Sequence, residues 1–160
     1  MSEPRVDTGE LPRPRVMAVA SGGGHWQQLM ILSPAFAEAD VLYVTTLKGL
    51  AENFEVSPAV LVTECNRHEK RKVLRCARDL WRELRRFRPD VVVTTGALPG
   101  VIALGLAKLL KVRTVWVDSV ANAEEMSLSG KLARRVADHW YSQWEHVAEA
   151  TGARYAGSIL

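Results

Sequence analysis

An α/β fold, with a parallel sheet covered by helices on both faces, is the fold class that this sequence predicts. Apolar runs rich in β-branched residues alternate with helical segments along the chain, and most of these runs lack a polar–apolar alternation. Glycine-containing loops follow the first and the fourth of these runs. Strands that are apolar on both sides are typical of a parallel sheet buried between two layers of helices.

The expected elements follow one another in a regular order. Strands are expected at 15–21, 40–45, 59–63, 91–95 and 112–117. Helices are expected at 25–36, 67–87, 100–110, 129–137 and 143–150, with an irregular connection at 46–57. Asn66 and Glu69 predict a capping box ahead of the longest helix. Pro99 suits the first turn of the helix at 100–110.

The helix expected at 67–87 is strongly amphipathic. Its apolar stripe consists of Val73, Ala77, Leu80, Leu84 and Phe87, with Leu74 and Trp81 beside it. Its other face carries Arg71, Arg75, Arg78, Arg82, Arg85 and Arg86. A basic amphipathic helix can lie on anionic lipid, although a solvated outer helix is the simpler interpretation. Cys76 falls on the apolar side, which predicts a small core residue.

Length and composition bound the class of protein. The chain has 160 residues, of which 48% are hydrophobic and 24% charged, enough for one domain with its own core. We expect a disordered polar tail over 1–14 and a single domain over 15–160. The net charge of +3 is too small to indicate a nucleic-acid partner. Cys65 and Cys76 lack metal-site spacing, so no metal site is predicted.

The sequence also limits the ways in which the chain could contact a membrane. The first residues contain no apolar stretch of the kind found in secretory signals. The longest apolar run, 97–110, is too short to span a bilayer. Membrane contact is therefore expected to be peripheral.

The most informative stretch runs from Ser21 through three glycines to His25. It lies between the first strand and the first helix, where bare backbone N–H groups can face a phosphate or a carboxylate. It contains neither the G-x-G-x-x-G pattern nor a Walker Gly-Lys-Ser/Thr triplet, which disfavours nicotinamide and ATP enzymes. A tight turn without a ligand is the alternative.

Other loops are expected to share one rim of the sheet with this stretch. Ligands of parallel sheets bind at the carboxyl ends of the strands, which places 95–100 and 118–122 near His25. Imidazole exchanges a proton near neutral pH, so His25 is a candidate general base, with a loop-ordering histidine as the alternative. Asp118 could bond His25 or a sugar, or simply form a turn.

Several motifs, taken in order, resemble a known family. They are Ser21-Gly22-Gly23-Gly24-His25 with Gln28-Leu29, Thr94-Thr95-Gly96, Val117-Asp118-Ser119, Ser127-Leu128-Ser129-Gly130-Lys131-Leu132, Ala137-Asp138 and Gln143-Trp144-Glu145. Across 15–160 this order resembles the acceptor-side, membrane-anchor-type subunit of two-component glycosyltransferases. Eukaryotic members begin with a transmembrane segment, so the polar start of this chain favours the bacterial branch, which serves capsule and exopolysaccharide assembly.

The resemblance implies a fold and a division of labour. The fold would be Rossmann-like, equivalent to the N-terminal half of a GT-B glycosyltransferase, which needs no metal. This chain would bind a lipid-diphosphate-linked sugar acceptor at the cytoplasmic face of the membrane, in exopolysaccharide, capsule or lipid-linked oligosaccharide synthesis. A separate donor-binding subunit would hold the nucleotide sugar, expected to be a UDP-sugar. This chain would then bind no cofactor itself and would be inactive alone.

The resemblance also assigns site residues by position. Contacts to the acceptor and its diphosphate are expected from Ser21, Gly22, Gly23, Gly24, Gly96, Gly100, Asp118, Ser119, Ser129 and Lys131, with His25 as the catalytic residue. The partner interface is expected at Gln143, Trp144, Tyr155, Ile159 and Leu160. Asn122 stands where the family often carries an arginine, which weakens a cationic phosphate contact there.

Plainer interpretations stay open beside these assignments. Gly96 and Gly100 could belong to an ordinary strand-to-helix turn, and Ser129 could be an ordinary helix N-cap. The whole chain could instead be a small self-sufficient transferase, or a non-catalytic module that only recruits a partner.

Overall fold

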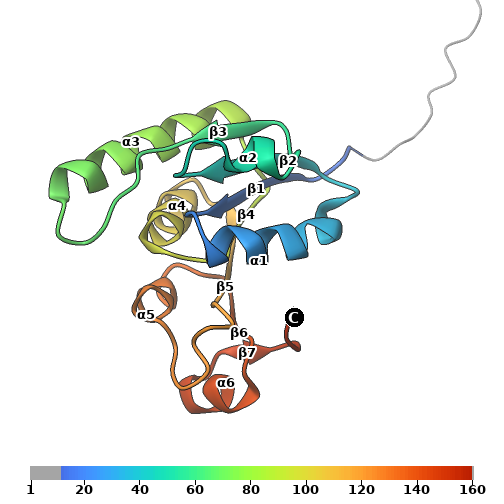
Figure 1. Ribbon diagram of the computed structural model, residues 1–160, viewed down its shortest axis with the longest axis vertical. Coiled ribbons are helices and arrows are strands. Elements are labelled where there is room, and N and C mark those ends of the chain that lie inside the picture. Colours follow the sequence, from blue (N-terminus) through green and yellow to red (C-terminus); the bar gives the residue numbers. More distant parts are fainter. Residues whose placement is uncertain (1–11, 160) are drawn as a thin grey trace, which may run out of the picture.

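A seven-stranded parallel sheet forms the centre of the molecule. The computed structural model describes residues 12–159. The tail expected over 1–14 therefore lies mostly outside the described residues, and so does Leu160. The strands are arranged in the order β3-β2-β1-β4-β5-β6-β7, and every neighbouring pair is parallel. This arrangement confirms the predicted fold class (Figure 1).

The strands are β1 (Arg15–Ala20), β2 (Asp40–Thr45), β3 (Ala59–Leu61), β4 (Val91–Thr94), β5 (Arg113–Val117), β6 (His139–Ser142) and β7 (Arg154–Tyr155). The helices are α1 (Gly24–Leu32), a 3-10 turn η1 (Ser33–Phe36), α2 (Leu50–Asn53), α3 (Lys70–Phe87), α4 (Leu98–Leu109), α5 (Leu128–Ala133) and α6 (Glu145–Thr151). Pro99 lies in the first turn of α4, as predicted.

Successive residues of the central strand β1 serve two separate cores. Met17 and Val19 pack with α3, α4 and α5 on one face of the sheet. Ala18 and Ala20 pack with α1 and α2 on the other face. Side chains alternate between the two faces of a strand, so a strand covered on both faces must be apolar throughout. Cys76 of α3 is fully buried in the first core, as predicted, and burial raises the pKa of its thiol.

The structure corrects the sequence-based elements at three places. Strands β6 and β7 extend the sheet where no strand was expected. The short helix α2 lies within the connection expected to be irregular. The capping box was wrong, because α3 begins at Lys70 with Glu69 as its N-cap, and no side chain caps it. Asn66 instead accepts a hydrogen bond from the backbone N–H of His68.

The strand order brings three loops to one edge of the sheet. The chain runs outward from β1 through β2 to β3, and then returns to place β4 on the opposite side of β1. The loops after β1, β4 and β5 therefore meet at the carboxyl ends of neighbouring strands, around the crevice where ligands of such sheets bind. Among residues 12–159, no helix combines the length and the hydropathy that crossing a bilayer requires.

Candidate functional site

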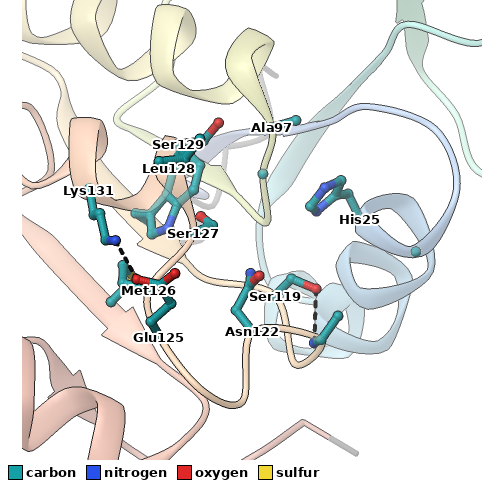
Figure 2. A pocket seen from close by; sticks show the side chains of 14 residues that line it. His25, Ala97, Ser119, Asn122, Glu125, Met126, Ser127, Leu128, Ser129 and Lys131 are labelled. Carbon is teal, nitrogen blue, oxygen red and sulfur yellow. Dashed lines mark hydrogen bonds and ion pairs between the residues drawn. The ribbon is translucent and has the colours of Figure 1, made fainter.

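A cavity of about 580 Å³ opens at the carboxyl ends of β1, β4 and β5. Gly24 and His25, at the start of α1, form one wall, and Gly96 and Ala97 form a second. The third wall consists of residues between β5 and the middle of α5, including Ser119, Asn122, Ser127, Ser129 and Lys131. Figure 2 shows His25 on one side of the cavity and the residues of α5 on the other.

The imidazole of His25 is held by the backbone of Thr95. Nδ1 lies 2.9 Å from the carbonyl oxygen of Thr95, and the Thr95 hydroxyl donates to the carbonyl of His25 at 2.6 Å. A carbonyl can only accept, so Nδ1 carries the hydrogen in the neutral ring. Nε2 is then the ring nitrogen with a lone pair, which suits a general base.

Gly96 makes room for this ring. Its φ is +127°, and a Cβ at this position would lie 2.5 Å from Nδ1 of His25. Both the backbone conformation and the space therefore require glycine here. Gly96 lies in the loop after β4 and His25 in the first turn of α1, so residues from two distant parts of the chain must fit one another here.

The first helix presents backbone donors to the cavity. Gly23 is the N-cap of α1 with a φ of 70°, and Gly24 is the first helical residue and lines the cavity. The first N–H groups of a helix have no partner within the helix, and the helix dipole favours an anion beside them. This end of α1 can therefore receive a negatively charged group.

Five of the expected contact residues do not line the cavity: Ser21, Gly22, Gly23, Gly100 and Asp118. Ser21 is buried. A Cβ on Gly22 would lie 3.1 Å from the side chain of Leu47, so Gly22 faces that loop. A Cβ on Gly100 would lie 2.2 Å from the hydroxyl of Thr94, so Gly100 allows α4 to pack closely on β4. The structure therefore gives Gly22 and Gly100 a packing role.

Asp118 points into the protein and not toward His25. Its carboxylate accepts hydrogen bonds from Trp116 Nε1 at 3.0 Å and from Asn122 Nδ2 at 3.1 Å. It also accepts from the backbone N–H of Ser127 at 3.0 Å and from the hydroxyl of Ser127 at 2.5 Å. Only 2% of Asp118 is exposed. Of the alternatives for Asp118, the structure therefore supports a carboxylate that organises the loop after β5 and not a bond to His25, because these donors already occupy both carboxylate oxygens.

The start of α5 forms the outer rim of the cavity. Ser127, and not Ser129, is the N-cap, and its hydroxyl accepts from the N–H of Gly130 at 2.8 Å. Ser129 and Lys131 line the cavity as expected. Lys131 Nζ donates to Glu125 Oε2 at 2.7 Å, which lowers the pKa of the Glu125 carboxyl. Figure 2 shows this ion pair at the edge of the cavity.

The residues expected at a partner interface differ in how far they are exposed to solvent. Gln143 is 3% exposed, so it cannot offer a surface, and that expectation was wrong. Trp144 and Ile159 are half-buried, and Tyr155 is exposed on β7 at the edge of the sheet. Leu160 lies outside the described residues.

Sequence reasoning gave no role to several residues that shape the site. Thr95 bonds His25, 70 residues earlier in the chain, and the hydroxyl of Ser127 bonds the carboxylate of Asp118. Gln28 of α1 is buried and donates to the Ser119 hydroxyl at 2.9 Å. A buried polar side chain in an otherwise apolar helix stripe is the signal that could have identified Gln28. In the described part of the chain, no three His, Cys, Asp or Glu side chains converge as metal ligands would.

Comparisons with protein families and with curated sequences both point to the Alg14-like family. A family model described as "Oligosaccharide biosynthesis protein Alg14 like" matches residues 55–159. The UDP-N-acetylglucosamine transferase subunit ALG14 of Eremothecium gossypii is 28% identical over 189 residues, which cover 98% of this chain and 84% of that protein. The Mus musculus protein of the same name is 35% identical over 72 residues, 40% of this chain and 32% of that protein.

Solved structures share the fold at low sequence identity. MurG of Acinetobacter baumannii superposes with a TM-score of 0.71 at 16% identity, over 91% of this chain and 44% of MurG. A UDP-N-acetylglucosamine 2-epimerase of Rickettsia bellii gives 0.72 at 16% identity, over 92% of this chain and 45% of the epimerase. These likenesses confirm the Rossmann-like fold expected of a GT-B N-terminal half. The chain spans less than half the length of these solved structures.

Proposed function

Because the chain belongs to the Alg14-like family of oligosaccharide biosynthesis proteins, we propose that it is the acceptor-binding subunit of a two-chain glycosyltransferase. The observation that carries this proposal is the cavity on the carboxyl rim, where Thr95 and Gly96 hold His25 beside the exposed N-terminus of α1. The cavity combines a candidate base, backbone donors and an ammonium group.

The chemistry of these groups fits a sugar acceptor attached to a lipid diphosphate. The start of α1 and Lys131, on opposite walls, favour negative charge, which suits a diphosphate. Hydroxyls of Ser119 and Ser129 and the amide of Asn122 suit a sugar. The two kinds of group share one cavity, so one ligand could engage both.

In this proposal His25 acts on the acceptor hydroxyl. Nε2 takes the hydroxyl proton while the acceptor oxygen forms its bond to the anomeric carbon of the donor sugar. The bond from that carbon to the nucleoside diphosphate breaks in the same displacement, and the diphosphate leaves with the electron pair. A positioned general base typically contributes about 10²–10⁴-fold to such a step.

The donor side is assigned to a second polypeptide. The solved relatives in fold are more than twice as long as the matched region, so this chain corresponds to one part of a larger architecture. We propose that the partner holds the nucleotide sugar and docks beside the exposed edge strand β7, at Trp144, Tyr155 and Ile159. The names of the curated relatives make UDP-N-acetylglucosamine the first donor to test.

A basic and apolar surface on α3 is proposed to touch the membrane. Leu74 is 72% exposed and Trp81 37% exposed, although both are large and apolar. They lie seven residues apart, which places them on one face of α3. Arg85 lies over the Trp81 ring at 5.9 Å from its centroid. Exposed aromatic and apolar side chains beside arginines suit the interface of an anionic bilayer.

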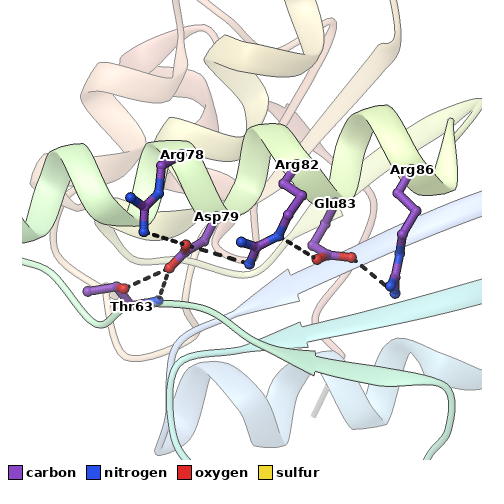
Figure 3. A network of polar contacts seen from close by, with 6 residues as sticks. All are labelled: Thr63, Arg78, Asp79, Arg82, Glu83 and Arg86. Atoms are coloured by element: carbon purple, nitrogen blue, oxygen red, sulfur yellow. Dashed lines mark hydrogen bonds and ion pairs between the residues drawn. The ribbon is translucent and has the colours of Figure 1, made fainter.

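Some arginines of α3 form ion pairs within the helix while their side chains stay exposed. Arg78 and Arg82 meet Asp79, and Arg82 and Arg86 meet the buried Glu83 (Figure 3). Asp79 also accepts from both the backbone N–H and the hydroxyl of Thr63, so it holds α3 against the loop after β3. We therefore assign Leu74, Trp81 and Arg85, which has no ion pair among the described residues, to lipid contact.

The setting of the reaction is also part of the proposal. We place the protein at the cytoplasmic face of the membrane, among bacterial members that serve capsule and exopolysaccharide synthesis. The curated relatives named above are eukaryotic UDP-N-acetylglucosamine transferase subunits, and the family is described as one of oligosaccharide biosynthesis, so we propose lipid-linked oligosaccharide synthesis as the alternative setting. A neighbouring reading frame that encodes a nucleotide-sugar-binding domain would support the two-chain assignment.

Reconstitution tests the two-chain proposal. The protein is purified from its native cell, any chain that copurifies is identified, and transfer from a panel of UDP- and GDP-sugars to a membrane extract is measured. We expect transfer by the pair and none by this chain alone. Robust glycolipid formation by the isolated chain would identify it as a self-sufficient enzyme. If the partner alone transfers sugar at the full rate, this chain has no part in the chemistry and only recruits the partner.

A further inference from the structure

Two buried glutamines connect the cavity to the C-terminal segment, defined here as residues 156–159. Gln28 of α1 and Gln143, directly after β6, are 5% and 3% exposed. Nε2 of Gln143 donates to Oε1 of Gln28 at 2.7 Å, although the two residues are 115 positions apart. Neither is among the residues that line the cavity, and the proposed sugar transfer uses neither.

Gln28 holds the loop that forms the third wall of the cavity. Its Nε2 donates to the hydroxyl of Ser119 at 2.9 Å, and its Oε1 accepts from the backbone N–H of Val120 at 3.0 Å. The Ser119 hydroxyl also accepts from the N–H of Ala121 at 3.2 Å. Ser119 and Ala121 both line the cavity. The position of the Gln28 amide therefore sets the position of this wall.

Gln143 holds the C-terminal segment at the other end of the connection. Its Oε1 accepts from the backbone N–H of Ile159 at 3.2 Å. Its Nε2, besides bonding Gln28, donates to the carbonyl of Asp118 at 2.9 Å. One amide therefore bonds the C-terminal segment, the end of β5 and Gln28 at the same time.

The chemistry of the amides gives this connection one orientation. Turning the Gln143 amide by half a turn would place its NH₂ against the N–H of Ile159, and its carbonyl against Gln28 Oε1 and the Asp118 carbonyl. Donor would then face donor and acceptor would face acceptor. Buried polar groups left unpaired are costly, so the network forms as a unit or is lost as a unit.

We propose that Gln28 and Gln143 are positioning residues that couple the C-terminal segment to the cavity wall. A partner subunit seated on that segment would then order residues 119–122, and the acceptor site would be complete only in the two-chain complex. This inference rests on the proposed docking of the partner at the C-terminal segment. Coupling is reciprocal, so a ligand that orders the wall would also strengthen binding of the partner.

Amide hydrogen exchange at Val120 tests the coupling in the isolated chain, without ligand or partner. Deleting residues 158–160 should speed exchange of the Val120 N–H by about tenfold, within the range of coupling between residues of one network. In a Gln143→Met background the same deletion should cause no further change. The matched control is Gln27→Met, at an exposed neighbour on α1, where the deletion should keep its full effect.

A second pair of variants leaves the interior intact, in case Gln143→Met does not fold. Ile159→Pro removes the N–H that Gln143 accepts, whereas Ile159→Ala keeps it. Only the proline variant should speed exchange at Val120. If both Ile159 variants speed Val120 exchange equally, the connection through the glutamines is wrong. It is also wrong if the deletion and Gln143→Met each speed Val120 exchange and their effects add.

Adding the partner completes the test. Partner binding should slow Val120 exchange in the unaltered chain, but not in Gln143→Met. A partner that binds without slowing Val120 exchange would overturn the proposed docking surface and the partner-dependent ordering. Additive behaviour in the isolated chain would overturn the glutamine connection itself. The two failures are therefore distinguishable.

Discussion

At the scale of single residues, the orientation of His25 depends on the loop after β4 more than on its own helix. The Thr95 carbonyl fixes the hydrogen on Nδ1, and Gly96 leaves the space in which the ring lies. The chemical role proposed for His25 therefore rests on a loop 70 residues away. A change as small as one methyl group in that loop should affect the base.

Gly96→Ala should reduce transfer by about 10²-fold, comparable to the loss of a positioned base. The new Cβ would lie 2.5 Å from Nδ1 of His25 and must displace the ring. The measurement is turnover of the two-chain reaction, accompanied by thermal melts. Gly152→Ala is the matched control, because Gly152 has a φ of +78° with no atom within 4 Å. If both variants lose the same turnover, backbone strain and not displacement of His25 is responsible.

Glu125→Gln should strengthen binding of inorganic pyrophosphate to the cavity by about twofold to fivefold. The Glu125 carboxylate pairs with Lys131 at the exposed rim of the cavity, where water weakens the attraction between the two charges, so the expected gain is small. Removing the negative charge leaves the ammonium for the anion. Titration calorimetry at low salt measures the effect, with Glu124→Gln as the control at an exposed neighbour. Unchanged affinity in Glu125→Gln, or unchanged affinity in Lys131→Met, would remove Lys131 from the proposed anion contact.

Several residues that line the cavity could be predicted from the sequence because the backbone alone places them. His25, Gly24 and Gly96 lie next to strand ends, and the parallel fold brings strand ends together. Asp118 and Gln143 also follow strands, but their side chains turn inward. Gln143 bonds Gln28, 115 positions away, and local sequence carries no signal for such a partner. The donors to Asp118 come from residues 116–127, but their side chains meet it only because the loop after β5 folds back over the strand end.

At the scale of elements, α5 packs unusually closely against β5 through Gly130. A Cβ there would lie 2.6 Å from Asp118 Oδ1 and 2.7 Å from Met126 Sδ. The Trp140 Nε1 also donates to the Gly130 carbonyl at 2.8 Å. The position of α5, and therefore of the outer rim of the cavity, depends on this contact.

Gly130→Ala should destabilise the protein by about 1–3 kcal/mol, as overpacking of a tight interior does. Gly105→Ala is the matched control within α4, where a Cβ would meet nothing within 4 Å. Alanine there should stabilise by about 0.5–1 kcal/mol, because it favours the helix. Urea denaturation of both variants measures these changes. A stable Gly130→Ala variant would show that α5 can move away from β5 at little cost.

The accuracy of the predicted elements follows the strength of their patterns. β1 and β4 are continuous apolar runs with glycines after them, and they were predicted to within one or two residues. β6 mixes His139 and Ser142 with aromatic residues, and β7 has only two residues. β6 forms because β5 offers an unpaired edge, and β7 then pairs with the free edge of β6. This is a tertiary effect that no local pattern contains.

At the scale of the whole molecule, the proposal assigns the acceptor to the cavity and membrane contact to the α3 surface. Leu74 and Trp81 expose apolar surface that the cores do not use. A lipid-linked acceptor lies at the bilayer, so contact at α3 would bring the chain to its substrate.

Flotation with anionic liposomes should show binding that weakens as salt is raised, because salt screens the attraction of arginines to lipid headgroups. Trp81→Ser should reduce the bound fraction at low salt by removing aromatic contact with the interface. Ile31→Ser is the control, since Ile31 is also exposed but lies on α1 at the opposite face of the sheet. Equal loss in both variants, or no binding by the two-chain complex at either salt, would contradict contact through α3.

Turnover of His25→Ala in the reconstituted two-chain reaction tests the central claim most directly. We predict a fall of about 10²-fold or more in kcat, with thermal melting and copurification of the partner unchanged, because the His25 ring lies at the cavity wall and not in either core. Near-normal turnover with a folded variant and a bound partner would show that this cavity does not carry the chemistry, and the acceptor-site assignment would be wrong.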